Sequence, residues 1–244
     1  MQGLILAAGM GTRLGERTKD IPKVMMDVEG KPLIMYALQR LYEQNVTETI
    51  IVVGYKKEYI MEKCGNHYKE MKLTYVINDR YETTNNVYSF YLSAEQIHDD
   101  LLMVEGDLLF SKQLLDHTLT NKHDCNIVVS KYNRNTMNGT VIKAEKDVAR
   151  ELITKKFQGE GFDYDSAWKT VNIYYFDREF MAKFSRMLEL YVETGNLNNY
   201  YELVLGALIY YGDDDIRIVV VDENDWFEID DERDLLIARE HGAF

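Results

Sequence analysis

The fold is decided by residues 4–23, which read LILAAGMGTRLGERTKDIPK. The opening apolar run is continuous rather than alternating, which is typical of a strand buried on both faces of a parallel sheet. The run ends in a loop that carries Gly9, Gly11 and Arg13, and Lys23 follows behind a proline. Glycines let a backbone approach a polyphosphate closely, so that its N–H groups can point at the oxygens, and two cations would neutralise their charge. The stretch therefore predicts a nucleoside triphosphate site.

The spacing in this loop excludes the two common phosphate motifs. A P-loop requires G-x-x-x-x-G-K-[ST], and a dinucleotide fingerprint requires a third glycine three residues after Gly11, where this chain has leucine. Two glycines alone are compatible with any tight turn between a strand and a helix. The longer string L-A-A-G-x-G-T-R-L followed by P-K is far more restrictive than a glycine turn.

The charge of the chain limits its partners. In its 244 residues, 41 acidic and 28 basic side chains give a formal net charge of −13. This balance argues against nucleic acid or an anionic membrane surface as a partner. A phosphate ligand is still expected, because residues 1–31 hold five Lys or Arg against four Asp or Glu and form a local island near neutrality.

We also expect a cytoplasmic protein. No apolar stretch approaches membrane-spanning length, and the N-terminus leads straight into a strand without the regions of a signal peptide. Cys64 and Cys125 are two isolated cysteines, so they are expected to be reduced and structural.

Strands and helices alternate along the first half, which predicts a mostly parallel mixed sheet with helices on both faces. Strands are expected at residues 3–8, 49–53, 73–77, 101–105, 126–130, 140–144, 171–176 and 216–221. Helices are expected after Pro32, at residues 86–97, 178–192 and 199–211, and from Asp230 or Asp231 as N-cap to about residue 241. We interpret residues 1–244 as a single domain, with a nucleotide-binding half (1–110) and an acceptor- and metal-binding half (111–244).

Three carboxylates are candidate ligands of a divalent cation, which nucleotidyl transfer needs to gather polyphosphate charge. Asp107 follows the expected strand 101–105, and ligand sites in open α/β sheets lie beyond that end. Glu228 and Asp230 share one side if their stretch is extended, and oxygen ligands suit magnesium. Asp107 as a turn residue and Asp230 as a helix N-cap are the alternatives. Glu105 is interpreted as a strand-end or supporting residue.

Further motifs give these residues a family context. Residues 78–81 (NDRY) and 85–92 (NNVYSFYL) are similar to a pattern N-D-x-Y…N-N-x-Y-S-L-x-L. With the glycine loop, Asp107 and residues 226–231, they make the chain resemble the nucleotidyltransferase superfamily. Within it, the resemblance is closest to the CTP:phosphocholine cytidylyltransferase-like group, which also acts on phosphonates and other phospho-alcohols. The resemblance implies a Rossmann-like, GT-A-related α/β fold that uses Mg²⁺.

The resemblance also implies roles for individual residues. Arg13 and Lys23 would stabilise charge during attack. The triphosphate loop would be formed by Gly9, Met10, Gly11, Thr12 and Arg13. The pyrimidine would lie near Leu6, Ala7, Ala8, Asn85, Asn86 and Ser89. Magnesium would be held by Asp107, Glu228 and Asp230.

One departure from the group concerns the acceptor. A quaternary ammonium is bound by aromatic rings, yet residues 136–140 (TMNGT), where one cage tryptophan is expected, contain none. Other aromatic candidates for the acceptor site are Tyr88, Tyr132, Trp168, Tyr200 and Tyr201, and Asn172 is a polar one. Alternatively, Glu202 and Glu228 bind a primary amine. Phosphocholine, aminoethylphosphonate and phosphoglutamine all stay open as acceptors.

We therefore predict an enzyme that transfers CMP from CTP, or a nucleotide from another NTP, to a small phosphorylated or phosphonylated alcohol or amine, with release of pyrophosphate. One alternative is a sugar-1-phosphate nucleotidyltransferase. A second is a nucleotide-binding regulator without catalysis, and a third is a glycosyltransferase with an Asp-based metal site, which the glycine loop disfavours.

Overall fold

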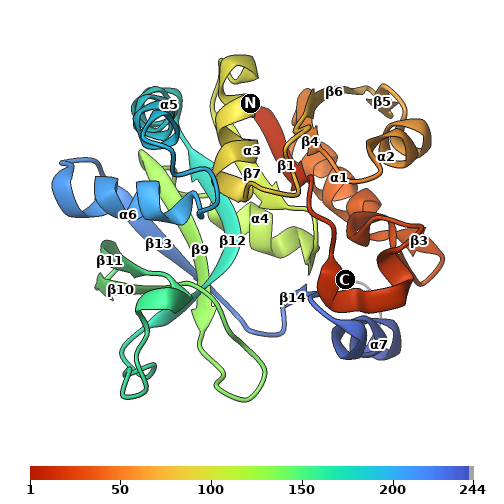
Figure 1. Cartoon of the computed structure of the whole chain (residues 1–244). Coiled ribbons are helices and arrows are strands. Elements are labelled where there is room, and N and C mark those ends of the chain that lie inside the picture. Colours follow the sequence, from red (N-terminus) through yellow and green to blue (C-terminus); the bar gives the residue numbers. More distant parts are fainter. Residues whose placement is uncertain (242–244) are drawn as a thin grey trace.

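A ten-stranded mixed sheet runs through the computed structural model, which describes residues 1–241 (Figure 1). Its strands are β1 (Gln2–Ala7), β4 (Glu48–Val53), β5 (His67–Tyr68), β6 (Met71–Ile77), β7 (Leu101–Glu105), β9 (Cys125–Lys131), β10 (Val141–Glu145), β11 (Val148–Ile153), β12 (Trp168–Phe176) and β13 (Ile216–Val221). Their order across the sheet is β10-β11-β13-β9-β12-β7-β1-β4-β6-β5. The same sheet therefore joins the two halves of the chain.

The first half contributes the parallel part of the sheet. β1 lies between β4 and β7, with Leu4 opposite Ile50 on one side and Met103 on the other. β4 is also parallel to β6. Because parallel strands end at the same edge, the residues that follow β1 and β7 come out side by side.

The second half departs from the expected share of parallel strands. β12 is antiparallel to both β7 and β9, and β10 is antiparallel to β11, whereas β13 is parallel to β9. The α/β class with a mixed sheet is confirmed, but antiparallel pairing is more extensive than a mostly parallel sheet implies. Apolar runs identify strands, whereas their direction depends on the connections between them.

Helices cover both faces of the sheet, as expected. One face is covered by α1 (Leu33–Glu43), α2 (Lys57–Cys64) and α4 (Lys112–Thr118), whose apolar residues share one buried cluster. The other face is covered by α3 (Asn86–Ser93), α5 (Arg178–Glu193) and α6 (Glu202–Tyr211) around a second cluster (Figure 1).

A third, smaller cluster joins the two ends of the chain. The last helix, α7 (Glu232–His241), packs on the short strand β2 (Asp27–Val28), which pairs with β3 (Lys31–Pro32). A second short ribbon pairs β8 (Leu108–Phe110) with β14 (Trp226–Glu228). Leu14, Leu109 and Ile229 are buried together in this cluster. The glycine loop and the C-terminal segment therefore lie against one another.

Each strand and helix expected from the sequence occurs, with ends shifted by at most four residues. The expected helix at residues 86–97 is α3 followed by a 3₁₀ turn, Ala94–Gln96. Among the described residues, two helices and six strands were not expected from the sequence, α2, α4, β2, β3, β5, β8, β11 and β14, and each is short or lacks a strong apolar period. No helix among residues 1–241 is long and apolar enough to cross a lipid bilayer.

Both cysteines have free thiols and are buried. Cys64 belongs to the first cluster and Cys125 to the second, on opposite faces of the sheet. Burial raises the pKa of the Cys64 thiol to about 11. The two thiols thus pack as small apolar side chains.

Candidate active site

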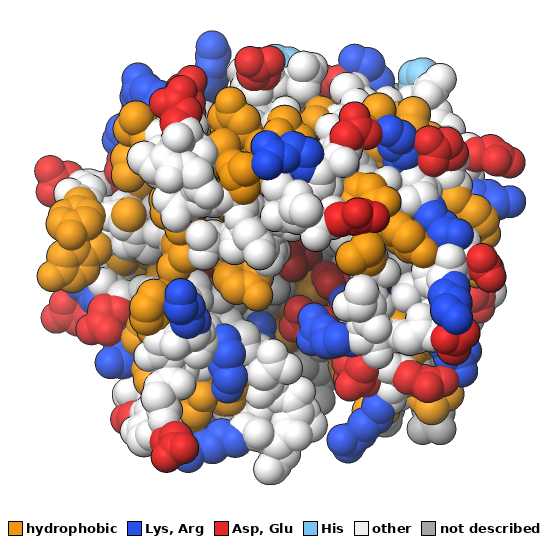
Figure 2. All heavy atoms as spheres, in the orientation of Figure 1, with side chains coloured by type: hydrophobic (Ala, Val, Ile, Leu, Met, Phe, Trp, Pro, Cys, Tyr) orange, Lys and Arg blue, Asp and Glu red, His pale blue; other side chains and the backbone are white. Residues whose placement is uncertain are grey.

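A cavity of about 570 Å³ opens where the ends of β1 and β7 face the second half of the chain. Figure 2 shows this hollow in the middle of one face, with acidic side chains at its bottom. On the nucleotide side it is lined by Leu6, Ala7, Ala8, Gly9, Gly11, Thr12, Arg13, Lys23, Asn85, Asn86, Ser89 and Asp107. Among the nucleotide-side candidates, only Met10 does not line the cavity.

The glycine loop packs directly against the lysine. Gly11 has φ +63°, and a Cβ built on it would lie 2.7 Å from Cβ of Lys23. The hydroxyl of Thr18 also donates to the Gly11 carbonyl at 3.2 Å. A left-handed backbone with no room for a side chain requires glycine here. The loop and Lys23 therefore form one packed unit, although 12 residues separate them along the chain.

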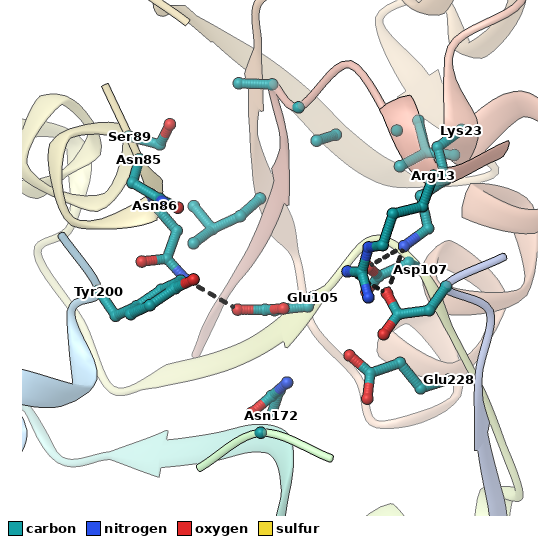
Figure 3. Close-up of a pocket in the computed structure, with 18 of the residues that line it drawn as sticks. Arg13, Lys23, Asn85, Asn86, Ser89, Glu105, Asp107, Asn172, Tyr200 and Glu228 are labelled. Carbon is teal, nitrogen blue, oxygen red and sulfur yellow. Dashed lines mark hydrogen bonds and ion pairs between the residues drawn. The ribbon is translucent and has the colours of Figure 1, made fainter. Parts of the chain in front are cut away.

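Lys23 is the buried centre of a cluster of opposite charges (Figure 3). Its Nζ donates to Oδ2 of Asp107 at 2.7 Å and to Oδ1 of Asp230 at 3.0 Å. Nη2 of Arg13 donates to the same Asp230 oxygen at 2.6 Å. Burial opposes the charge on Lys23, but Asp107 and Asp230 outweigh it and raise the pKa of Lys23 above its usual value. The structure thus brings all four of these expected residues into contact.

The C-terminal ribbon explains why Asp230 is free to reach the lysine. Glu228 in β14 pairs with Leu108, and the amide of Ile229 donates to the carbonyl of Asp107 at 3.0 Å. The cap of α7 is Asp231, whose Oδ1 accepts from the amides of residues 233 and 234 at 2.8 and 3.0 Å. Of the two N-caps expected for this helix, the structure selects Asp231.

A group of three carboxylates lies beside the lysine. Glu105, Asp107 and Glu228 each offer one oxygen, and these oxygens lie within 4.8 Å of one another. Oδ1 of Asp107 is buried and has no hydrogen-bond partner among the described residues. Burial, reinforced by Asp107 and Asp230 and opposed by Lys169, raises the pKa of Glu228 to about 7. Oxygen donors around an unpartnered buried oxygen fit a hard divalent cation such as Mg²⁺.

The three carboxylates of this group are not the same three that the sequence predicts as metal ligands. Glu105 takes the place of Asp230, which is bound to the two cations instead. Burial and the neighbouring Asp107, Glu202 and Glu228 carboxylates raise the pKa of Glu105 well above its usual value. A sequence signal for Glu105 existed, because residues two apart at a strand end project to the same side, and Asp107 was recognised there.

The opposite end of the cavity is built from amides and carboxylates. Nδ2 of Asn86 donates to Oε1 of Glu105 at 3.3 Å, and the Tyr201 hydroxyl donates to the same oxygen at 3.1 Å. Asn85 caps α3, and Ser89 accepts a hydrogen bond from Asn78 at 3.1 Å. Figure 3 shows Glu105 between this group and the pair Arg13 and Lys23.

The acceptor candidates separate into two sets. Asn172, Tyr200, Glu202 and Glu228 line the cavity. Tyr88, Tyr132, Trp168 and Tyr201 do not line it. Tyr132 stacks on Tyr164 with ring centroids 4.3 Å apart, and Tyr201 is fully buried in the second cluster. The structure therefore removes most of the expected aromatic rings from the acceptor space.

Two cavity residues have unusual environments. Lys169, which the sequence analysis did not single out, is only 2% exposed, and its Nζ lies 3.7 Å from Oε2 of Glu228. A lysine inside the apolar run of β12 was the available signal. Asn172 in the same strand has φ +60° at an irregularity between Thr170 and Tyr174, and its side chain faces the cavity (Figure 3). Left-handed residues of this kind cluster at functional sites.

Comparison with known proteins gives a family match. A model described as MobA-like NTP transferase domain matches residues 3–166. Over 236 residues, 96% of this chain, the sequence is 30% identical to CMP-5'-(3-aminopropyl)phosphonate synthase of Streptomyces rubellomurinus. Over 123 residues, 49% of this chain, it is 39% identical to choline-phosphate cytidylyltransferase of Streptococcus pneumoniae. The expected resemblance to nucleotidyltransferases is confirmed.

Solved structures agree on the fold. CTP:phosphocholine cytidylyltransferase from Streptococcus pneumoniae superposes with a TM-score of 0.78 at 24% identity, and the match covers 98% of each chain. Inositol-1-phosphate CTP transferase from T. maritima gives a TM-score of 0.74 at 20% identity. The expected Rossmann-like fold is confirmed. The matched regions span 37% of the length of the Streptomyces relative and 50% of the Streptococcus relative.

Proposed function

Because this chain belongs to the MobA-like NTP transferase family, we propose that it is an enzyme that transfers CMP from CTP to a small phosphorylated or phosphonylated amine or alcohol, with release of pyrophosphate. One observation carries the proposal. Arg13 and Lys23 contact Asp107 and Asp230 at the edge of one cavity, next to a group of three carboxylates. Cations that are already ordered beside a dication site are suited to a polyphosphate.

The reaction requires no side-chain nucleophile. An anionic oxygen of the acceptor attacks the α-phosphorus in line, so that a P–O–P bond forms while the bond to the β-phosphate breaks and its electrons leave with pyrophosphate. Catalysis is then positioning and charge neutralisation. The amides of the glycine loop and Arg13 hold the β- and γ-phosphates, and Lys23 bridges the α-phosphate and the attacking oxygen.

The carboxylates give Mg²⁺ a place in this scheme. Asp107 and Glu228 would hold the ion, with Glu105 as a third ligand. Asp230 orients Lys23 and Arg13 through its ion pairs with them. When bound, the ion supplies charge neutralisation on the triphosphate and its leaving group. Because Lys23 is buried, bulk water screens its ammonium less, and its attraction to the substrate phosphate is stronger than at an exposed position.

The relatives support cytidine as the base and a phosphonate or phosphate acceptor. The Streptomyces relative is a CMP-(3-aminopropyl)phosphonate synthase, and the Streptococcus relative acts on choline phosphate. A further relative, 28% identical over 137 residues, is the CTP:phosphoglutamine cytidylyltransferase of Campylobacter jejuni. Each of these names combines CMP, CTP or a cytidylyl group with a small charged molecule.

We infer three finer properties alongside this activity. Residues 1–244 act as a single domain, with nucleotide held by residues 1–110 and acceptor and metal by residues 111–244, although Glu105 and Asp107 cross that division. The enzyme works in the cytoplasm, which its two free thiols support. The net charge of −13 supports an absence of nucleic-acid and membrane partners.

A substrate panel tests the proposal directly. Pyrophosphate release is measured with CTP, UTP, dTTP and ATP against phosphocholine, aminoethylphosphonate, phosphoglutamine and sugar 1-phosphates. We expect CTP with a phospho- or phosphono-acceptor to give the highest turnover, and a chelator of divalent cations to abolish it. The highest turnover with a sugar 1-phosphate would identify the runner-up, a sugar-1-phosphate nucleotidyltransferase. Nucleotide binding without pyrophosphate release from any pair would indicate a regulator instead.

A further inference from the structure

A buried carboxylate with no cation of the described residues in direct contact lies at the acceptor end of the cavity. Glu202, the first residue of α6, lines the cavity and is 5% exposed. Its Oε1 accepts a hydrogen bond from the hydroxyl of Thr140 at 3.3 Å. Its Oε2 is buried and has no hydrogen-bond partner among the described residues. A buried acceptor that lacks a donor is costly, so a bound donor at this point is favoured.

Among the described residues, the cations that line the cavity are Arg13, Lys23, Lys155 and Lys169, and all four are engaged elsewhere. Nζ of Lys155 donates to the hydroxyl of Tyr164 at 3.4 Å. Lys23 and Arg13 contact Asp107 and Asp230. Nζ of Lys169 donates to the carbonyl of Thr170 at 2.6 Å and faces Glu228, so it acts on Glu202 only through space. Glu105, another carboxyl group of the cavity, supplies no positive charge to Glu202.

The donor that this position lacks is an N–H group with positive charge. A primary ammonium has three such donors, whereas a quaternary ammonium has none and is bound through aromatic faces. Among the described residues, Tyr81 and Tyr200 are the aromatic side chains that line this cavity. The Tyr81 ring already contacts Tyr55, and Tyr200 is 46% exposed. These two rings do not form a closed cage around a trimethylammonium group.

From this geometry we propose that Glu202 is the specificity-determining residue of the acceptor site, and that it selects acceptors carrying a primary ammonium over those with a quaternary ammonium or with no ammonium group. The inference rests on the proposed transfer of CMP to a small phosphorylated or phosphonylated acceptor. The acceptor then lies with its anionic oxygen toward Lys23 and its ammonium on Oε2 of Glu202. Thr140 orients the carboxylate through Oε1.

The first test is a methylation series on the intact chain. With CTP and Mg²⁺, kcat/KM is measured for phosphoethanolamine, its N-methyl and N,N-dimethyl derivatives, phosphocholine, and ethylene glycol phosphate, which has a hydroxyl in place of the ammonium. We expect the highest value for phosphoethanolamine and a fall of about 100-fold or more to phosphocholine, since a site built to bond N–H groups rejects analogues without them. Phosphocholine equal to or better than phosphoethanolamine would overturn the proposal, while CMP transfer itself would stand.

The second test is Glu202→Gln. We expect kcat/KM for phosphoethanolamine to fall about 100-fold, because one partner of a buried charge pair is lost. The kcat/KM for ethylene glycol phosphate and the KM for CTP should stay within a few fold of the wild-type values. Thr140→Val, which removes only the supporting hydroxyl, should shift the preference in the same direction by a smaller factor. Glu189→Gln, at an exposed position on α5, is the matched control.

Two outcomes separate this inference from the proposed function. Equal losses in Glu202→Gln for acceptors with and without an ammonium group, in a variant whose thermal unfolding matches the wild type, would show that Glu202 is only structural. Absence of pyrophosphate release from the wild type with every acceptor would instead remove the proposed function itself.

Discussion

The two ends of the cavity differ in how their charges are balanced. At one end, which we call the cation end, Arg13 and Lys23 meet Asp107 and Asp230 in direct ion pairs. At the other, the acid end, Glu105 is partly buried and Glu202 is buried, and the hydrogen bonds to them come from neutral hydroxyl and amide groups. The cation end is thus ordered before substrate arrives, whereas we expect a cation from the substrate to complete the acid end. The difference indicates which part of a substrate each end accepts.

The largest expected effect is at the cation end. Lys23→Ala should lower kcat about 10²–10³-fold, because a donor aimed at developing charge is lost. Steady-state pyrophosphate release measures it, and circular dichroism checks that the variant folds. Lys19→Ala, an exposed lysine of the same loop paired with Glu16, should leave turnover unchanged. Near-wild-type turnover in Lys23→Ala would contradict the mechanism.

A second variant tests the metal site between the two ends. Asp107→Asn should raise the Mg²⁺ concentration for half-maximal activity about 10–100-fold, since the amide is a poorer ligand than the carboxylate. A Mg²⁺ titration at saturating CTP measures this. Asp79→Asn, an exposed residue paired with Lys57, serves as control. An unchanged Mg²⁺ requirement would exclude Asp107 as a ligand.

Glu228 lies between the ends and makes stability depend on pH. Burial raises the pKa of Glu228 to about 7, above the value of about 4.3 expected unfolded. The folded state therefore holds this proton more tightly, so stability without metal should fall as the pH rises from about 4.5 through 7. Glu228→Gln should remove this loss, about 1–3 kcal/mol between pH 5 and pH 8.

Denaturant unfolding at the two pH values, without divalent cations, measures the effect. Glu189→Gln should retain the wild-type pH dependence. We also expect added Mg²⁺ to stabilise the wild type more at pH 8 than at pH 5, because the ion needs the ionised carboxylate. An identical pH profile for wild type and Glu228→Gln would show that Glu228 does not carry the dependence.

The smallest expected effect separates strain from binding at the acceptor side. Asn172 has φ +60°, and the structure records no partner for its Nδ2 among residues 1–241. Asn172→Gly should raise the acceptor KM about 5–10-fold with a stability change below about 1 kcal/mol, because glycine tolerates this backbone. Asn172→Ala should raise KM equally but lose about 1–2 kcal/mol.

Lys146→Gly provides the matched control, because Lys146 has φ +58° in the turn between β10 and β11, outside the lining of the cavity. Its acceptor KM should equal that of the wild type. An unchanged KM in both Asn172 variants would limit Asn172 to a backbone role.

The two ends also differ in how far the sequence alone predicts them. Short sequence motifs identify the glycine loop, Lys23, Asp107 and Asp230. They do so because a close backbone approach requires glycine, and because the end of a strand shows in the sequence as the end of an apolar run. The sequence predicts only a strand-end or supporting role for Glu105, and it does not identify Lys169 as a cavity residue. Their environment depends on β12 lying antiparallel to β7, which no local pattern encodes.

The sequence by itself determined that strands and helices alternate, that a glycine loop followed by two cations comes after the first strand, and that carboxylates stand at residues 107 and 228–230. These features follow from periodicity and backbone constraints within a few residues. Only the tertiary structure decided that Asp231 rather than Asp230 caps α7, that most candidate tyrosines lie outside the cavity lining, and that Oε2 of Glu202 has no hydrogen-bond partner among the described residues. Such outcomes depend on which distant side chains meet in a buried space, because burial and neighbouring charge set the behaviour of a carboxylate.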